Sequence, residues 1–475
     1  MRIKFMRKFI KNIMEIKERI SIDRLHNNEK SVVQNCRYEI NQSLKSMKEC
    51  VQHDENNILV AGEIIKERGL GVFCNRISQQ ISNVHFYYLA ESEIRDEIIF
   101  PVFVVPQMFF RNAYKVGKRL NIAKKVYKVI NSKDYLKWAV DNTKGRYSDI
   151  AEGYAENFVF LSYQYLNKVL DIVKPKAVVL WLKFYAFHEI LFNICKERDI
   201  IVYFFEFGVL PGTYVFEPIG QMGESLPAIN YEEFFDLEVD KSDIIHAQKV
   251  LEYLYKNRIT RWKQPSKDES VIDGLKNRLI SGRPVVLYAG QNDYESGVRP
   301  YGEFAKKFHS PVFESSDQAA VYLGNLAKEK NWNIIYKPHP AVLRFATQWK
   351  EYVIPDNVII VDRIDINDLI DISDVLVTIV SQMGYMSLIR GKPTVMLGYT
   401  QLRGKHCTYE AFSQNVIEKA INSAIQYGMT EEQSTYFTKH IAQILKYYVY
   451  DDGEQRDVRY GKQVIQCIEF IKTNE

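Results

Sequence analysis

Residues 374–397 read DVLVTIVSQMGYMSLIRGKPTVML, and this stretch decides the fold class. The apolar, β-branched run at 374–380 predicts a buried strand. The residues GYMSLIRG (384–391) predict a helix, and TVML (394–397) predicts the next strand. A strand, a helix and a strand joined by short loops form a βαβ unit. We therefore expect a parallel sheet covered by helices on both faces.

The same alternation continues on the N-terminal side of this stretch. Strands are expected over 177–182, 200–205, 284–290, 333–337 and 357–361, and helices over 187–197, 317–330 and 366–373. Residues 232–283 are charged and largely helical, with breakers at Pro265 and at Gly282–Pro284, so they predict a crossing between two α/β domains. Ligands of such open sheets bind beyond the carboxyl ends of the strands, in a cleft between the domains.

The predicted organisation has five parts. They are a basic N-terminal helical segment (1–50), a Rossmann-like acceptor domain (51–264), a linker (265–283), a Rossmann-like nucleotide-sugar domain (284–410), and C-terminal helices that cross back to the first domain (411–475).

The composition excludes several classes of protein. Apolar residues make up 46% of the 475 residues and charged residues 26%, which excludes a disordered chain. Lys and Arg number 63 against 59 Asp and Glu, so no strong positive field favours nucleic-acid binding. The six cysteines are scattered without metal-ligand spacing, which suits a reducing compartment. No run reaches the ~18 apolar residues of a membrane span. We expect a cytoplasmic protein.

Residues 1–30 contain nine Lys and Arg against four Asp and Glu, with apolar residues at approximately helical spacing. One interpretation is a helix that rests on the anionic face of the cytoplasmic membrane. The other is an amphipathic helix docked on the protein itself. The sequence favours neither.

Two predicted loops carry side chains suited to a phosphate. In KPHP (337–340), two prolines hold His339 on a stiff turn beside Lys337. Ser381 ends a strand where a helix begins, and a helix N-terminus with a serine hydroxyl can bind an anion without a metal. The alternatives are a loop histidine without a ligand and a serine that only caps its helix.

Two further loops carry carboxylates. In GQNDYESG (290–297), Asp293 can bind sugar hydroxyls or accept a proton, or it can simply make a turn. We interpret residues 205–225 as one long loop, in which Glu206 and Glu217 are candidate bases or nucleophiles toward a glycosyl centre. The alternative is a capping or salt-bridged acid.

Together these motifs resemble the bacterial capsule polysaccharide biosynthesis family of Kdo transferases, over about residues 175–408. The resemblance lies in EFGVLPGT (206–213), Glu217 with Gly220-Gln221, the Gln291-x-Asp293 loop, KPHP, and a signature in 381–393. The matched positions of that signature are Ser381, Gly384, Leu388, Gly391, Lys392 and Pro393.

The resemblance implies a GT-B fold, in which two Rossmann-like domains with parallel sheets face a central cleft. It implies transfer of Kdo or a related ulosonic acid from a CMP donor to a glycan or glycolipid, with no metal and no further cofactor. A carboxylate near the anomeric carbon would serve a retaining mechanism, and Glu206 is preferred over Glu217 and Asp293. The nucleotide would be bound by Lys337, His339, Ser381, Gln382 and Gly384, and the substrate by Gln291, Gly208 and Thr213.

The chain departs from the family pattern in two places, one of which is the strand WLKFYAF (181–187), where the usual Trp-Asn-Gly ending is absent. The other is Met386, where family members have a glutamate. That glutamate is expected to bind the ribose of the nucleotide, so its absence bears on which donor this chain uses. The alternatives that remain are a CDP-glycerol glycerophosphotransferase, an isomerase of the nucleotide-sugar 2-epimerase type, and a binding protein without turnover.

Overall fold

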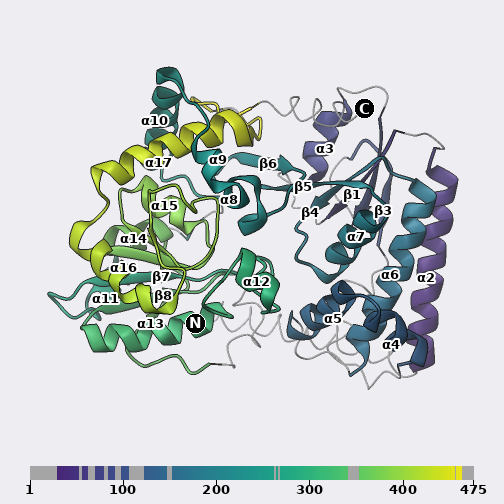
Figure 1. Cartoon of the computed structure of the whole chain (residues 1–475), viewed down its shortest axis with the longest axis horizontal. Coiled ribbons are helices and arrows are strands. Elements are labelled where there is room, and N and C mark those ends of the chain that lie inside the picture. The colour runs from purple at the N-terminus through teal and green to yellow at the C-terminus, as the bar shows by residue number, and fades with distance from the viewer. Residues whose placement is uncertain are drawn as a thin grey trace, which may run out of the picture. The chain divides into compact units, whose positions relative to one another are not determined.

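The computed structural model describes residues 29–52, 56–62, 70–79, 84–90, 98–105, 122–146, 152–261, 264–265, 268–340, 352–454 and 456–462. The chain divides into two compact units, Met1–Val202 and Tyr203–Glu475 (Figure 1). The predicted domain boundaries stay a prediction. Residues 1–28, on which the membrane-helix interpretation rests, lie outside the described residues.

The first unit contains a parallel sheet with the described order β4-β1-β2-β3. These strands are Ala177–Trp181, Asn57–Gly62, His85–Ala90 and Val102–Val104. Strands β1 and β4 are buried along their whole length, as their continuous apolar sequences require. The described helices of this unit are α2 (Glu29–Cys50), α3 (Leu70–Ser78), α4 (Lys124–Asn131), α5 (Asp134–Arg146), α6 (Tyr154–Val173) and α7 (Ala186–Glu197).

The second unit contains a six-stranded sheet with the described order β12-β11-β10-β7-β8-β9, in which every pair is parallel. Its strands are β7 (Val285–Ala289), β8 (Asn333–Lys337), β9 (Val358–Ile360), β10 (Val375–Thr378), β11 (Thr394–Met396) and β12 (Tyr409–Glu410). The five strands predicted from Pro284 to Leu397 are confirmed, as are the helices α13 (Ser316–Lys330), α14 (Ile366–Ile372) and α15 (Met383–Ile389).

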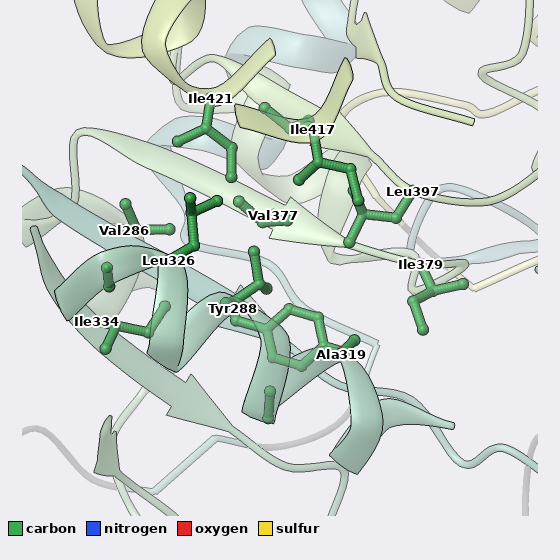
Figure 2. Packing of buried hydrophobic residues seen from close by; sticks show 14 of the residues in the cluster. Val286, Tyr288, Ala319, Leu326, Ile334, Val377, Ile379, Leu397, Ile417 and Ile421 are labelled. Carbon is green, nitrogen blue, oxygen red and sulfur yellow. The ribbon is translucent and has the colours of Figure 1, made fainter. Parts of the chain in front are cut away.

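The central strand β7 shows why this sheet is covered on both faces. Val286 and Tyr288 lie in a core formed with α13 and with α16 (Gln414–Tyr427), part of which Figure 2 shows. Val285 and Leu287 lie in a second core with α14 and with α11 (Glu269–Lys276). Successive side chains of a strand point to opposite faces, so an all-apolar strand fits only between two layers of helices. The predicted α/β class is confirmed.

An antiparallel hairpin precedes this sheet in the chain. Strand β5 (Ile201–Phe207) pairs with β6 (Thr213–Glu217), and β6 pairs with β13 (Val449–Asp451). The interpretation of 205–225 as one loop is therefore wrong. Glycine and proline mark only the short turn at 208–212, where Gly212 has φ +83°, and the aromatic residues on either side continue as strands.

The second unit has seven further described helical elements. They are η3 (Met222–Glu224), α8 (Leu226–Ile229), α9 (Tyr231–Phe235), α10 (Lys241–Lys256), α12 (Glu303–Phe308), α17 (Glu431–Gln443) and the π-helix η6 (Ile444–Tyr448). Of these, α8, α9, α10, α17 and η6 contribute to a third core. Helices α10, α15 and α17 each contribute buried residues to this core. The tail is thus helical as expected up to Tyr448, and β13 is a strand that the sequence did not predict. Among the described helices, none has the length and apolar character to cross a membrane.

Candidate functional site

The register of the six-stranded sheet brings several candidate residues to one edge. Ala289, the last residue of β7, lies opposite Lys337 of β8 on one side and Thr378 of β10 on the other. The three strands therefore end at the same level, and their loops leave the sheet side by side. Gln291, His339 and Ser381 follow these strand ends within three residues. The carboxyl edge of this sheet is the first half of the candidate site.

Thr378 fixes the loop that carries Ser381. Its hydroxyl donates to the Ala289 carbonyl at 2.7 Å and accepts from the Ser381 amide at 3.2 Å. The Ser381 hydroxyl accepts a hydrogen bond from the Met383 amide at 3.3 Å, so it helps to hold the first residue of α15, although the N-cap position itself is Gln382. Its own proton remains available to a phosphate oxygen. Ser381 and Gln382 are half-buried.

Gly384 lies one turn further along α15 and is buried. A Cβ there would lie 3.3 Å from atoms of Leu402 and of Met396. Its contribution to the structure is close packing. Met386, where the family has a glutamate, is buried in the core on the α11 and α14 side of the sheet.

The side chains of the KPHP loop have different surroundings. The Lys337 ammonium donates to the Ile364 carbonyl at 2.9 Å and to the Asp362 carbonyl at 3.4 Å. Burial lowers the pKa of Lys337, and the nearby carboxylates of Asp362 and Asp365 oppose that shift. Lys337 therefore holds the loop after β9 while adding positive charge to the edge. His339 is half-buried beside the buried Pro338.

Asp293 belongs to a network centred on Ser316, at the start of α13. Its carboxylate accepts from the Ser316 amide at 3.0 Å, the Ser316 hydroxyl at 2.8 Å and the Gln291 side-chain amide at 2.6 Å. Burial raises the pKa of Asp293, and these hydrogen bonds oppose the rise. These hydrogen bonds fix the loop after β7. The side chains of Asp293 and Gln291 are bonded to each other.

The second half of the candidate site is a group of three glutamates, which we call the acid cluster: Glu206, Glu217 and Glu224. Glu206 is half-buried on β5 and accepts a hydrogen bond from the Met222 amide. Burial raises its pKa to about 7, although the charge of Arg261 and the bond from Met222 lower it. A carboxyl group with this pKa exchanges its proton near neutral pH.

Glu217 is held more firmly. Its carboxylate accepts from the Tyr448 hydroxyl at 2.7 Å and from the Leu226 amide at 2.9 Å. Burial raises the pKa of Glu217 to about 8, and the negative charges of Glu206 and Glu224 add to the rise. The acid cluster is thus a coupled set, in which Glu217 is fixed and buried and Glu206 is more exposed.

Gly208 and Thr213 shape the turn of the hairpin, and their predicted contact with substrate stays a prediction. The Gly208 amide donates to the Thr213 carbonyl at 2.7 Å, and the Thr213 hydroxyl donates to the Leu210 carbonyl at 2.7 Å. A Cβ at Gly208 would lie 1.9 Å from the Thr213 hydroxyl oxygen. Both predicted substrate-binding residues therefore hold the turn next to Glu206.

His309 connects the acid cluster to the sheet edge. Its Nε2 atom lies 3.2 Å from Glu224 Oε1, and both side chains are buried. The His309 carbonyl accepts from the amide of Tyr399, in the loop after β11, at 2.8 Å. Glycines surround this point, since a Cβ at Gly223, Gly297 or Gly398 would lie 1.7 to 2.5 Å from atoms of Phe308 or His309. The two halves form one site within the second unit.

Sequence reasoning missed four residues of this site: Glu224, Arg261, His309 and Tyr448. Glu224 had a usable signal, because it is the third glutamate within 205–225. Arg261 lies in the segment interpreted as a crossing and Tyr448 in the helical tail, whereas no element was predicted around His309, and no local pattern distinguishes the three. Among the described residues, no group of three or more His, Cys, Asp and Glu has metal-ligating geometry.

Residues 240–418 match the family described as capsule polysaccharide biosynthesis protein. The match covers less than half of the chain, and over this segment the chain is similar to that family. The segment contains the carboxyl edge with its KPHP and Ser381 loops, as well as Arg261 and His309, and the resemblance found in the sequence is thereby confirmed. No curated protein matches the sequence.

Several solved structures are similar to this chain at low scores. The β-Kdo 2,4-transferase of Thermosulfurimonas dismutans KpsC is 16% identical with a TM-score of 0.40, covering 56% of this chain and 79% of that one. The corresponding β-Kdo 2,7-transferase is 18% identical with a TM-score of 0.39, covering 66% and 90%. A Methanocaldococcus jannaschii UDP-GlcNAc 2-epimerase, solved with UDP-GlcNAc and UDP, is 10% identical with a TM-score of 0.35, covering 88% and 99%. At these scores the likenesses carry no argument about activity.

Proposed function

We propose that the protein is a glycosyltransferase of capsule or surface polysaccharide biosynthesis. It transfers Kdo or a related ulosonic acid from a CMP donor to a glycan or glycolipid acceptor. The observation that carries the proposal is the acid cluster joined through His309 to a sheet edge suited to a phosphate. The family match of residues 240–418 supports the same conclusion.

The sheet edge would bind the CMP phosphate. Ser381 and the amides at the start of α15 supply hydrogen-bond donors, the His339 imidazole can supply another, and Lys337 adds positive charge. These groups stabilise the negative charge that develops on the phosphate as the bond to the anomeric carbon breaks. They act without a metal, and activity that survives chelation of divalent cations would support this part of the proposal.

Glu206 would act at the anomeric carbon. It is the more exposed member of the acid cluster, and its pKa of about 7 leaves a substantial ionised fraction at neutral pH. As a nucleophile it would take the sugar from CMP and pass it to the acceptor hydroxyl, which gives retention of configuration. Glu217, fixed by Tyr448 and Leu226, would set the charge around it.

The test begins with the nucleotide. Thermal unfolding is measured with CMP, CDP, UDP and GDP at equal concentrations, and a ligand at ~100 times its Kd adds about 2.7 kcal/mol to native stability. Selective stabilisation by CMP, followed by release of CMP from CMP-Kdo in the presence of a glycan acceptor, is the expected result. Preference for CDP would favour glycerophosphate transfer, and no response to any nucleotide would favour a binding protein without turnover.

An isomerase of the 2-epimerase type is the second candidate, because the acid cluster supplies a pair of carboxyl groups with raised pKa values. Glu206 and Glu217 titrate near pH 7 and pH 8, and such groups suit removal and return of a proton next to the anomeric carbon. Incubation with UDP-N-acetylglucosamine in deuterated water separates the two functions. Deuterium at C2 of the sugar would support the isomerase and contradict the transferase.

A further inference from the structure

Arg261 is held at the end of β5, close to Glu206. Its Nη2 atom donates to the carbonyls of Gly208 and of Phe207, the latter at 3.4 Å. Its guanidinium carbon lies 5.4 Å from the centre of the Phe207 ring. Among the described residues these are its two hydrogen bonds, and both use one nitrogen. A guanidinium has five N–H groups, so those on Nη1 and Nε remain for a ligand.

The charge of Arg261 is costly where it lies. Burial lowers the pKa of Arg261 to about 10, and the carboxylate of Glu206 opposes that shift. The side chain therefore stays protonated at neutral pH. Arg261 and Glu206 attract each other without a contact ion pair among the described residues. Two backbone carbonyls alone do not require a full positive charge, since a neutral amide can donate to them at lower desolvation cost.

We propose that Arg261 binds the carboxylate of the donor sugar and so selects an ulosonic acid over a neutral hexose. The inference rests on the proposed function. In a 2-ulosonic acid the carboxylate is attached to the anomeric carbon itself, so the group held by Arg261 lies one bond from the carbon that reacts. Binding this carboxylate next to Glu206 therefore positions the anomeric carbon for attack.

The electrostatics of the acid cluster support this choice of ligand. An anionic sugar that approaches Glu206, Glu217 and Glu224 is repelled unless a cation lies beside it. Arg261 is the cation that acts on Glu206. Guanidinium N–H groups match the spacing of carboxylate oxygens and form strong charge-assisted hydrogen bonds. A neutral hexose offers only uncharged hydroxyl oxygens, which accept weaker hydrogen bonds from a guanidinium than a carboxylate does.

The experiment compares CMP with CMP-Kdo as ligands, since the two differ in the sugar and its carboxylate. Calorimetric Kd values are measured for the wild type, for Arg261→Gln and for Arg261→Lys. Arg258→Gln is the matched control, because Arg258 lies in the same segment and pairs with Asp365 and Asp368 instead. Thermal unfolding of each variant reports whether it is folded.

In wild type, CMP-Kdo is expected to bind more tightly than CMP. In Arg261→Gln this preference should fall about tenfold or more while the Kd of CMP changes less than about twofold, as expected for loss of one charge-assisted contact. Arg261→Lys should keep part of the preference, and Arg258→Gln should keep all of it.

Two results would overturn the inference. If Arg261→Gln weakens CMP and CMP-Kdo equally, or changes neither, then Arg261 serves only to hold the hairpin. If the wild type binds CMP but does not distinguish CMP-Kdo from it, the donor class of the proposed function is wrong, and the assignment of Arg261 falls with it. The first result leaves the transferase proposal intact, so the two failures can be told apart.

Discussion

The His309 imidazole lies 3.2 Å from the Glu224 carboxylate, and this buried pair joins two parts of the chain that are 85 residues apart. Glu224 follows the β5–β6 hairpin, whereas His309 follows α12 and contacts the loop after β11 through its backbone. The acid cluster is therefore anchored to the same sheet whose edge carries His339 and Ser381. A ligand that orders one half of the site is expected to order the other.

The His309–Glu224 contact is expected to contribute to folding stability. In a double-mutant cycle with His309→Ala, Glu224→Ala and the double variant, we expect a coupling energy of about 1 kcal/mol or more, as for directly contacting buried polar groups. Denaturant unfolding of the four proteins measures it. Strictly additive losses would show that the two side chains do not interact.

Glu206→Gln should abolish sugar transfer and leave CMP binding nearly unchanged, because the amide keeps the shape of the side chain and cannot act as a nucleophile. In wild type, kcat/KM should rise as the pH increases through about 7, since the ionised form is the active one. A variant with normal turnover would remove Glu206 from the mechanism.

Ser381→Ala and His339→Ala should each raise the Kd of CMP by about tenfold, the effect of losing one hydrogen bond to a charged group. Thr430→Ala is the control for Ser381, because the Thr430 hydroxyl also accepts a hydrogen bond from a backbone amide at the start of a helix, α17, and lies outside the site. It should lower stability by ~1 kcal/mol without changing the Kd of CMP. Equal Kd values in Ser381→Ala and the wild type would show that Ser381 only holds the start of α15.

Glu217 makes stability depend on pH. Because its pKa of about 8 lies above the ordinary value of 4.5, the folded state holds this proton more tightly than the unfolded state. Its stabilising contribution is complete below pH 4.5 and is lost as the pH rises through about 8. The neutral Glu217→Gln should flatten this dependence by ~1 kcal/mol or more, since one pKa unit corresponds to ~1.4 kcal/mol. Unfolding at a series of pH values measures it, and parallel curves for the two proteins would contradict the assignment.

Gly208→Ala should destabilise the protein by about 2 kcal/mol or more, because the new methyl group overlaps the Thr213 hydroxyl. Gly274→Ala is the matched control in the exposed part of α11, where a Cβ meets no atom within 4 Å. There the change should be neutral or stabilising by up to ~1 kcal/mol through helix propensity. Thermal unfolding of both variants measures these changes. Equal melting temperatures for Gly208→Ala and Gly274→Ala would show that the hairpin tolerates a Cβ.

The six-stranded sheet could be predicted from sequence because its signals are local. The apolar runs at Val285–Ala289 and Asn333–Lys337 are short, β-branched and bounded by loop residues, and both are strands as expected. Strand ends also identify the loops beyond them, so the placement of Ser381 and His339 at one edge followed from the chain alone. The strand β6 was missed because Gly208, Pro211 and Gly212 dominate the pattern around it.

The acid cluster could not be predicted because its contacts are distant in sequence. Tyr448, which donates to Glu217, lies 231 residues further along the chain. Arg261 lies in a charged segment where nothing distinguishes it from its neighbours Arg258 and Lys256. Burial and tertiary pairing set the pKa values of these groups, and no local spacing encodes them.

The hydrogen bond from Tyr448 to Glu217 also sets an order of events during synthesis. Glu217 leaves the ribosome long before η6 and β13, which supply its hydroxyl donor and the partner strand of β6. The nascent chain can complete the six-stranded sheet with β12 while the carboxyl group of Glu217 still lacks that donor. The protein would therefore become active only late in translation. A ribosome-stalled chain that ends before residue 444 should have a folded central sheet and no transferase activity with the donor.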